Sequence, residues 1–246
     1  MERIRDWAFS LLFPLMTGIY CILLIFGPLL PRKSTLEVAF VWLRSVAWLE
    51  RNVLGLDYRV IGRDNLPKHG SFIVAAKHQS TYETMKFHPL LGDPAIVMKR
   101  ELMRLPIWGW FARRAGMIPI DRSAGRFAIE EMLAAARAAI AEERPIVIFP
   151  QGTRVAAGHR RRYKMGAAVL YAELGLPIVP MALDSGLFWP KHGRKRGGTV
   201  TFSFLQPIAP GLSQEQALAI LEQRLEAETD RLLALHGVET SGAVAA

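Results

Sequence analysis

The pattern of hydrophobic positions changes along the chain, and its first part predicts a membrane segment. Between Trp7 and Pro31 no charged residue occurs, and large apolar side chains dominate. About 20 such residues are enough for a helix to cross a bilayer, so residues 7–31 are predicted to form a membrane-embedded helix. Pro14 interrupts the run and could kink the helix or divide it into a re-entrant pair, so a spanning and a re-entrant segment both fit the pattern.

The second part, residues 36–54, has apolar residues at helical spacing with Trp and Arg side chains between them. We predict an amphipathic helix in the membrane interface, where both residue types are favoured, although a helix that covers the core of a domain has a similar pattern. Gly55 is expected to end this helix. Residues 1–55 are therefore assigned to membrane attachment.

The third part, residues 56–238, alternates short apolar runs with amphipathic stretches. Strands are predicted at 58–62, 72–76, 94–98, 116–122, 145–149, 177–183 and 198–204, and helices at 99–110, 124–143, 164–174 and 213–235. This alternation predicts a three-layer α/β domain. Residues 239–246 are expected to be a disordered tail.

Composition and charge agree with membrane contact. Hydrophobic residues make up 51% of the 246 residues, and 31 Lys and Arg against 22 Asp and Glu give a formal charge of +9. Positive charge suits anionic lipid, a phosphorylated substrate or nucleic acid, and charge alone does not choose among them. Because Cys21 is the only cysteine, an intramolecular disulfide is impossible and cysteine-based metal sites lack ligands.

The stretch from Phe72 to Glu83 holds the strongest candidate for catalysis. An apolar run delivers His78 into a polar turn that Glu83 follows. In a continuous helix or strand the two side chains would diverge, but a strand–loop–helix junction, capped by Ser80 or Thr81, lets them meet. A carboxylate on one imidazole nitrogen fixes the tautomer and leaves the other nitrogen as a general base. A histidine that only caps a helix or sits satisfied in a loop fits the same residues.

No nucleophilic side chain is evident beside this pair, and G-x-S-x-G, Walker A, G-x-G-x-x-G and H-E-x-x-H patterns do not occur. We therefore expect the base to activate a hydroxyl group of a substrate. Arg122 and Arg154, at predicted strand ends, suit a phosphate monoester because guanidinium groups bind phosphate oxygens bidentately. Gly152 and Thr153 would add further donors. An internal salt bridge is the structural alternative for each arginine.

Four sequence blocks, in this order and spacing, closely resemble the 1-acylglycerol-3-phosphate acyltransferase family. They are Lys77–Ser80 with Glu83, Gly116–Arg122, Phe149–Arg154 and Ile178–Ala182, and the match spans about residues 58–210. The resemblance implies a three-layer glycerolipid-acyltransferase-like α/β domain. It also implies transfer of a fatty acyl group from acyl-CoA or acyl carrier protein to lysophosphatidic acid, which gives phosphatidic acid for phospholipid biosynthesis.

The resemblance assigns roles to individual residues. It makes His78 the general base, and Glu83 stands where the family usually has Asp. The residues implied to bind the substrate are Arg122, Gln151, Gly152, Thr153, Arg154 and Lys99. Gln151 replaces the usual Glu of the third block, which leaves the acceptor's identity open, and Lys99 could equally be solvated. The fourth block is expected to shape the acyl pocket.

The expected partners are a lysophospholipid acceptor, acyl-CoA or acyl carrier protein, and membrane lipid. No metal or cofactor is expected, and no nucleic acid, because the basic residues lack a recognition module. We expect the protein at the cytoplasmic (inner) membrane, with its active site at the cytoplasmic face. Two alternatives stay open: an acyltransferase for lyso-ornithine lipid or glycerol 3-phosphate, and a non-catalytic anionic-lipid-binding protein that uses its basic surface, including residues 191–196.

Overall fold

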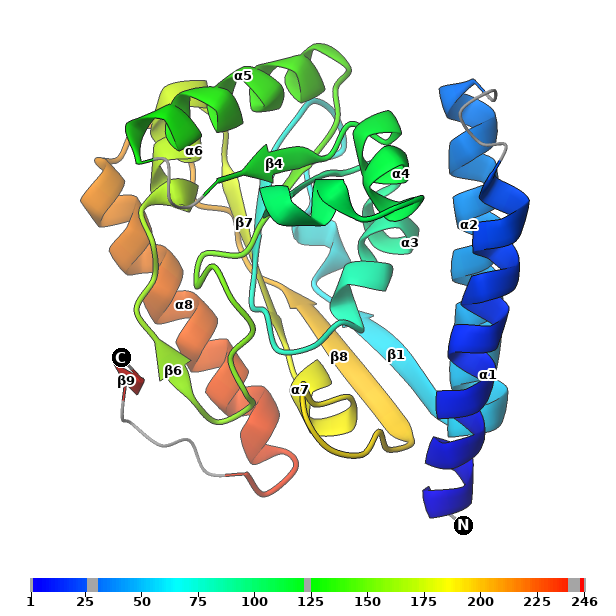
Figure 1. Cartoon of the computed structure of the whole chain (residues 1–246). Helices are drawn as coiled ribbons and strands as arrows, with labels where there is room; N and C mark the ends of the chain where they lie inside the picture. The colour runs from blue at the N-terminus through cyan, green and yellow to red at the C-terminus, as the bar shows by residue number, and fades with distance from the viewer. Residues whose placement is uncertain (1, 26–30, 122–124, 239–243, 246) are drawn as a thin grey trace.

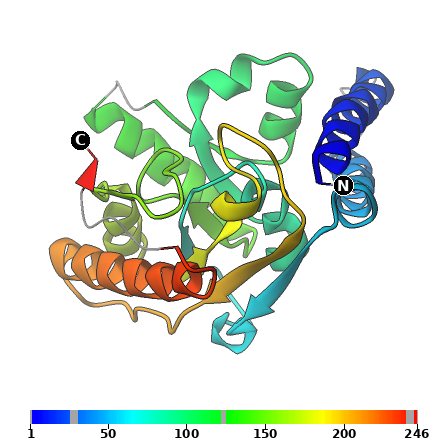
Figure 2. The same ribbon diagram turned by 90° about the horizontal axis from the view of Figure 1, so that it is seen from below.

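A computed structural model describes residues 2–25, 31–121, 125–238 and 244–245 of the chain. A sheet with helices on both faces forms the body of the molecule, and two long helices stand side by side at one flank (Figure 1). Seen from below, α8 (Gln214–Ala234, orange) and the long helices (blue) lie on opposite sides of the molecule (Figure 2). The three-layer α/β class predicted from the alternating pattern is confirmed.

Seven strands form a mixed sheet in the order β1-β8-β7-β2-β5-β3-β4. They are β1 (Leu56–Ile61), β2 (Ile73–Ala76), β3 (Ala95–Lys99), β4 (Ile118–Ile120), β5 (Ile146–Ile148), β7 (Ile178–Leu183) and β8 (Gly198–Phe204). In the sheet, the neighbouring strands β7, β2, β5, β3 and β4 all run parallel. At the other edge, β8 is antiparallel to β7, and β1 is parallel to β8. Each strand overlaps one of the predicted ranges.

The helices of the domain also match the sequence pattern in most places. They are α3 (Phe87–Leu91), α4 (Trp108–Arg114), α5 (Arg126–Ala141), α6 (Gly166–Leu174), α7 (Ser185–Phe188) and α8 (Gln214–Ala234). Ser213 caps α8 through a capping box with Gln216. The helix predicted at 99–110 is instead a 3₁₀ turn, η5 (Arg100–Arg104), followed by α4, and α7 was not predicted. Of the tail, Val244–Ala245 (β9) pairs with Arg160–Arg161 (β6).

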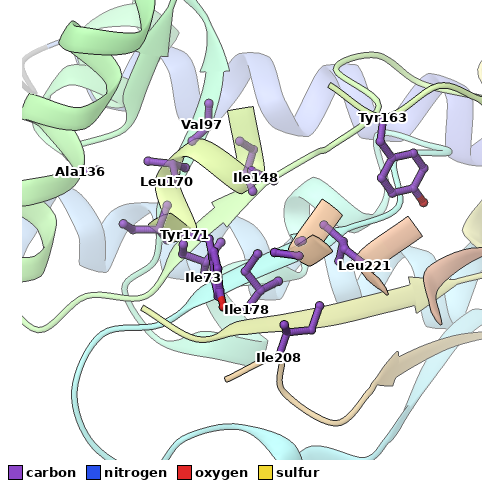
Figure 3. Close-up of a cluster of buried hydrophobic side chains, with 14 of the residues drawn as sticks. Ile73, Val97, Ala136, Ile148, Tyr163, Leu170, Tyr171, Ile178, Ile208 and Leu221 are labelled. Atoms are coloured by element: carbon purple, nitrogen blue, oxygen red, sulfur yellow. The ribbon is translucent and has the colours of Figure 1, made fainter. Parts of the chain in front are cut away.

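Two apolar cores lie on the two faces of the sheet. Side chains alternate along β2, so that Ile73 and Ala75 face one core while Val74 and Ala76 face the other. The first core packs the sheet against α5, α6 and α8, and Figure 3 shows strand residues of this core together with residues of those helices. Because both faces are covered at the centre of the sheet, β2, β5 and β7 are apolar throughout, whereas β1 and β8 contain polar residues such as Arg59 and Thr201.

The two long helices form a hairpin. α1 (Glu2–Leu23) is followed by α2 (Arg32–Leu49), which continues into a π-helix, η2 (Glu50–Leu54), and ends at Gly55 with a left-handed φ of 75°. The helix predicted at 7–31 therefore starts and ends earlier, although residues 26–30 lie outside the described part. Pro14 lies inside a continuous helix and does not divide it. Among the described residues, α1 is the helix long and apolar enough to cross a membrane.

The hairpin packs against the domain and also has an exposed apolar face. Phe9 of α1 and Val46 of α2 are buried in the second core. On the outer side Trp7, Leu15 and Trp48 are 69%, 60% and 61% exposed. One face of the hairpin thus covers the domain, while the other offers apolar surface. The interfacial location of α2 stays a prediction.

Candidate active site

The strand order gathers the predicted site at one edge of the sheet. His78 follows β2, residues 151–154 follow β5, and Lys99 ends β3. Because β2 lies between β7 and β5, the turns after β7 and β5 flank the turn that carries His78. The backbone N–H of Val155 donates to the carbonyl oxygen of His78 at 2.7 Å, which ties two of these turns together.

The predicted contact between His78 and Glu83 is present. Nδ1 of His78 lies 2.8 Å from Oε1 of Glu83, whose side chain is fully buried. Since a carboxylate only accepts hydrogen bonds, Nδ1 carries the proton and Nε2 is left as the acceptor. The imidazole also stacks on Phe149, with ring centroids 4.0 Å apart. The ring is therefore held in orientation and tautomer, as a general base requires.

Glu83 is held by hydrogen bonds from two parts of the chain. Its Oε1 accepts from the backbone N–H groups of Gln79 at 2.9 Å and Ser80 at 2.7 Å, in addition to His78. Its Oε2 accepts from the hydroxyl of Ser185 at 2.7 Å. Ser185 belongs to the short helix α7, and sequence analysis missed it because no local pattern relates it to Glu83.

The local conformation around Glu83 differs from the one we expected. Neither Ser80 nor Thr81 caps a regular helix here. Glu83 instead opens a 3₁₀ turn, η4 (Glu83–Met85), which precedes α3, and Ser80 Oγ accepts from the N–H of Tyr82 at 3.0 Å. The tight turn still reverses the chain enough for Glu83 to reach His78, so the prediction of the contact did not depend on the helix type.

A cavity of about 660 Å³ opens in front of His78. The domain and the hairpin line it together, and most of the lining side chains are apolar or aromatic. Those from the hairpin are Phe13, Thr17, Tyr20, Cys21, Leu24, Leu36, Ala39, Phe40, Trp42 and Leu43. The cavity is thus an apolar space bounded on one side by the predicted membrane segment, with the imidazole in its wall.

Four of the predicted binding residues line the same cavity as His78: Lys99, Gly152, Thr153 and Arg154. Arg154 is exposed at this wall and donates to the hydroxyl of Thr81 at 3.0 Å. Its described partner is thus a neutral hydroxyl and not a carboxylate. Lys99 is half exposed and lies 3.4 Å from Glu101. A guanidinium and an ammonium therefore face the apolar space beside the base.

Arg122, Gln151 and the fourth sequence block differ from the other predicted parts of the site. Arg122 lies outside the described residues. Gln151 is fully buried, and its side-chain amide has no hydrogen-bond partner among the described residues and is not part of the cavity wall. Residues 178–183 form the buried strand β7 and do not line this cavity, so the expectation that the fourth block shapes the acyl pocket stays a prediction. Its apolar pattern reflects a central strand covered on both faces.

Buried charges surround the dyad on both sides. Lys77 donates to Glu226 at 2.7 Å, and Lys86 pairs with Glu50. Burial lowers the pKa of both lysines, while the paired carboxylate opposes that shift. His88 lines the cavity, and burial lowers its pKa as well. None of these groups touches the His78–Glu83 pair through a hydrogen bond that the structure describes.

Comparison with known proteins gives a consistent result. A family model described as Acyltransferase matches residues 57–184. The 1-acyl-sn-glycerol-3-phosphate acyltransferase of Pseudomonas aeruginosa is 32% identical over 241 residues, which cover 95% of this chain and 92% of that protein. The enzyme of the same name from Saccharomyces cerevisiae is 32% identical over 162 residues, which cover 64% of this chain and 53% of that protein.

A solved structure agrees at the level of the fold. The crystal structure of the 1-acyl-sn-glycerophosphate acyltransferase PlsC from Thermotoga maritima superposes with a TM-score of 0.74 at 23% identity, and the match covers 95% of this chain and 98% of that one. The bacterial sequence match spans nearly the whole chain, including the hairpin and the cavity wall. On this evidence the chain belongs to the 1-acyl-sn-glycerol-3-phosphate acyltransferase family.

Proposed function

We propose that this protein transfers a fatty acyl group from an acyl thioester to the free hydroxyl of 1-acylglycerol 3-phosphate, giving phosphatidic acid. The observation that carries the proposal is the position of an oriented imidazole in the wall of an apolar cavity that Arg154 also lines. The apolar space suits acyl chains, and the guanidinium suits a phosphate monoester. The relatives' names indicate the same acceptor.

In the proposed reaction, Nε2 of His78 takes the proton of the acceptor hydroxyl while that oxygen attacks the thioester carbonyl carbon. Glu83 stabilises the imidazolium that forms. The tetrahedral intermediate then collapses, the C–S bond breaks, and the imidazolium proton neutralises the departing thiolate. The carbonyl carbon thus exchanges sulfur for oxygen with no net redox change. The proposed steps use protein groups and the two substrates, so they need no cofactor.

Arg154 and Lys99 have separate proposed roles beside the base. Arg154 binds the phosphate of the acceptor, because its planar fork matches two phosphate oxygens and its described contact is with a neutral hydroxyl. Lys99 supports negative charge on the phosphate or on the developing oxyanion. Thr153 and Gly152 border the same wall. Arg122 is proposed to share phosphate binding on the resemblance alone.

The identity of the acceptor is tested by offering lysophosphatidic acid, lyso-ornithine lipid and glycerol 3-phosphate in parallel to the purified protein. Acyl-CoA and acyl carrier protein loaded with the same chain serve as donors. We expect phosphatidic acid as the main product. Preferential use of another acceptor would contradict the proposed substrate but not the transferase chemistry. No turnover with any pair would contradict the proposed function.

Phosphate binding is tested with Arg154→Ala. Loss of one charge-assisted contact, worth about 1.5–3 kcal/mol, should raise the KM for lysophosphatidic acid roughly tenfold to a hundredfold and leave the KM for the donor nearly unchanged. Arg126→Ala is the matched control, because Arg126 is exposed on α5 and pairs there with Glu130. Equal rises in the KM for donor and for acceptor would indicate that Arg154 has a structural role and does not bind the phosphate.

We further propose that the hairpin holds the cavity at the cytoplasmic face of the inner membrane. Polar contacts fix the hairpin to the domain near both ends: the backbone N–H of Lys195 donates a hydrogen bond to the carboxylate of Asp6 at 3.2 Å, and Arg32 forms an ion pair with Asp93 at 2.6 Å. The opposite side of the hairpin is apolar and exposed. Apolar burial is not screened by salt, so the protein should stay with membranes in high salt and in alkaline carbonate. Release by salt alone would contradict embedding.

A further inference from the structure

Ser185 is the first residue of α7 and directly follows the segment that leaves β7. Its hydroxyl donates to Oε2 of Glu83 at 2.7 Å across a sequence separation of 102 residues, and both side chains are fully buried. The contact exists because β7 and β2 are neighbours in the sheet. Removing either group would leave the other buried without this hydrogen bond, which costs free energy.

The two oxygens of Glu83 depend on different parts of the molecule. Oε1 is held by three groups of the adjacent loop, namely His78 Nδ1 and the N–H groups of Gln79 and Ser80. For Oε2, Ser185 is the partner that the described structure provides. Rotation about the terminal bond of a glutamate is soft, so a hydrogen bond to the second oxygen fixes the plane of the carboxylate. That plane determines how Oε1 meets the imidazole.

The turn that carries Ser185 is rigidly supported. The N–H of Gly186 donates to the side-chain oxygen of Gln79 at 2.9 Å, and a Cβ added at Gly186 would lie only 3.0 Å from the Cβ of Gln79. On the other side, Asp184 accepts from the N–H of Thr201 in β8 at 2.7 Å. The hydroxyl of Ser185 therefore approaches Glu83 from a fixed position.

We propose that Ser185 is a positioning residue for acyl transfer, whose hydroxyl orients the carboxylate of Glu83 and, through it, the imidazole of His78. The inference rests on the proposed function. It also gives a physical reason for Glu at position 83. Its long arm reaches both the loop after β2 and the turn after β7, whereas an aspartate on the same backbone is one methylene group shorter and has to give up one of these contacts.

The first test is Ser185→Ala. We expect kcat to fall roughly tenfold to a hundredfold, the range for a lost hydrogen bond to a charged group. The KM values for donor and acceptor should change little, because Ser185 is not part of the cavity wall. Ser185→Cys keeps a weak donor of similar size, so its kcat should lie between those of the wild type and Ser185→Ala.

Ser203→Ala is the matched control. Ser203 lies in β8, is 2% exposed, and donates to Oε1 of Glu228 at 2.7 Å. Its loss removes the same kind of hydrogen bond at a distance from the dyad. We expect a fall in Tm comparable to that of Ser185→Ala, with kcat close to that of the wild type. An equal loss of kcat in both variants would show that the serines only stabilise the fold and would overturn the proposal.

A double-mutant cycle with Glu83→Ala shows whether the hydroxyl acts through the carboxylate. In that background Ser185 has no carboxylate to orient, so adding Ser185→Ala should lower the remaining kcat by less than about threefold, a sign of coupling between the sites. An unchanged penalty for Ser185→Ala would overturn the proposal, as would a wild-type kcat in the single variant. An inactive wild-type protein would contradict the proposed function itself, so the two failures are distinguishable.

Discussion

The segment from Lys77 to Lys86 carries the dyad and is anchored at both ends by a buried lysine–glutamate pair, but the pairs differ in their surroundings. Lys77 reaches α8, where Glu226 also accepts from the hydroxyl of Tyr163 at 2.9 Å. Lys86 reaches η2 at the base of the hairpin and pairs with Glu50. One anchor thus fixes the dyad to the interior of the domain, and the other fixes it to the hairpin.

The hairpin-side anchor is less completely hydrogen-bonded. Oε1 of Glu50 has no hydrogen-bond partner among the described residues, and burial raises the pKa of this carboxyl group. The buried charge of Lys86 is stabilised in part by a cation–π contact with the ring of Tyr82, whose centroid lies 4.5 Å from Nζ. Both partners of the Lys77–Glu226 pair accept or donate hydrogen bonds, although Nε of the nearby Arg160 lacks a partner among the described residues. Because a more completely satisfied buried network is more rigid, we expect the α8 side to hold the dyad more firmly than the hairpin side.

The largest effect, on the rate of acyl transfer, is expected for the His78–Glu83 dyad, which lies between the two anchors. His78→Ala should reduce acyl transfer roughly 10²–10⁴-fold, the usual contribution of a general base, while both anchors and the thermal unfolding temperature stay close to those of the wild type. Turnover of lysophosphatidic acid at saturating donor measures it. Glu83→Gln, which keeps the volume but removes the charge, should also lose much of the rate. Activity of His78→Ala within about threefold of wild type would contradict the general-base role.

The next largest effect is expected at the α8-side anchor. Glu226→Ala leaves Lys77 buried without its carboxylate and should lower the free energy of unfolding by about 3–5 kcal/mol. Denaturant unfolding in detergent micelles, followed by tryptophan fluorescence, measures the change. The double variant Lys77→Met with Glu226→Leu is the control, because it removes both charges and should recover most of the loss. A single variant as stable as the wild type would show that this anchor is dispensable.

A smaller effect is expected at the hairpin-side anchor. Glu50→Ala should lower the free energy of unfolding by about 1–3 kcal/mol, because Lys86 keeps its contact with the ring of Tyr82. Lys86→Met combined with Glu50→Leu is the corresponding control. The same unfolding experiment ranks the two anchors directly. A greater loss for Glu50→Ala than for Glu226→Ala would reverse the proposed order of rigidity.

The smallest effect concerns the pH dependence of stability, which we expect the buried His88 to contribute on the hairpin side of the dyad. His88 lies on α3 beyond Lys86, contacts Phe40 of α2 edge-to-face, and has its pKa lowered by burial. Below the ordinary histidine pKa of about 6.5 the unfolded chain binds a proton that the folded protein resists, so stability falls as pH falls. Measured from pH 8 to pH 5, Tm should drop less in His88→Asn, by a few degrees at most. Identical pH profiles would exclude this histidine as the source.

The sequence by itself determined the elements and the chemistry that lies within short segments. Short stretches rich in apolar residues identified the strands of the main sheet, including β1 and β8 with their interspersed polar residues, and the spacing of His78 and Glu83 identified a dyad, because strand and turn formation depend on neighbouring residues. The uncharged N-terminal run identified an apolar helix in the same way. The predicted bounds of that helix and the regular helix predicted at Glu83 were less accurate, since packing against the domain decides where a helix begins and ends.

Only the tertiary structure decided which turns meet. The order β7-β2-β5 brings Ser185 to the dyad from the side opposite the predicted residues 151–154, and no local pattern relates Ser185 to Glu83. The hairpin completes the cavity in front of the imidazole, and the two buried lysines find their carboxylates on α8 and η2. The reason is physical: strand pairing and burial join segments far apart in the chain, and their free energy depends on the packed whole and not on any one segment.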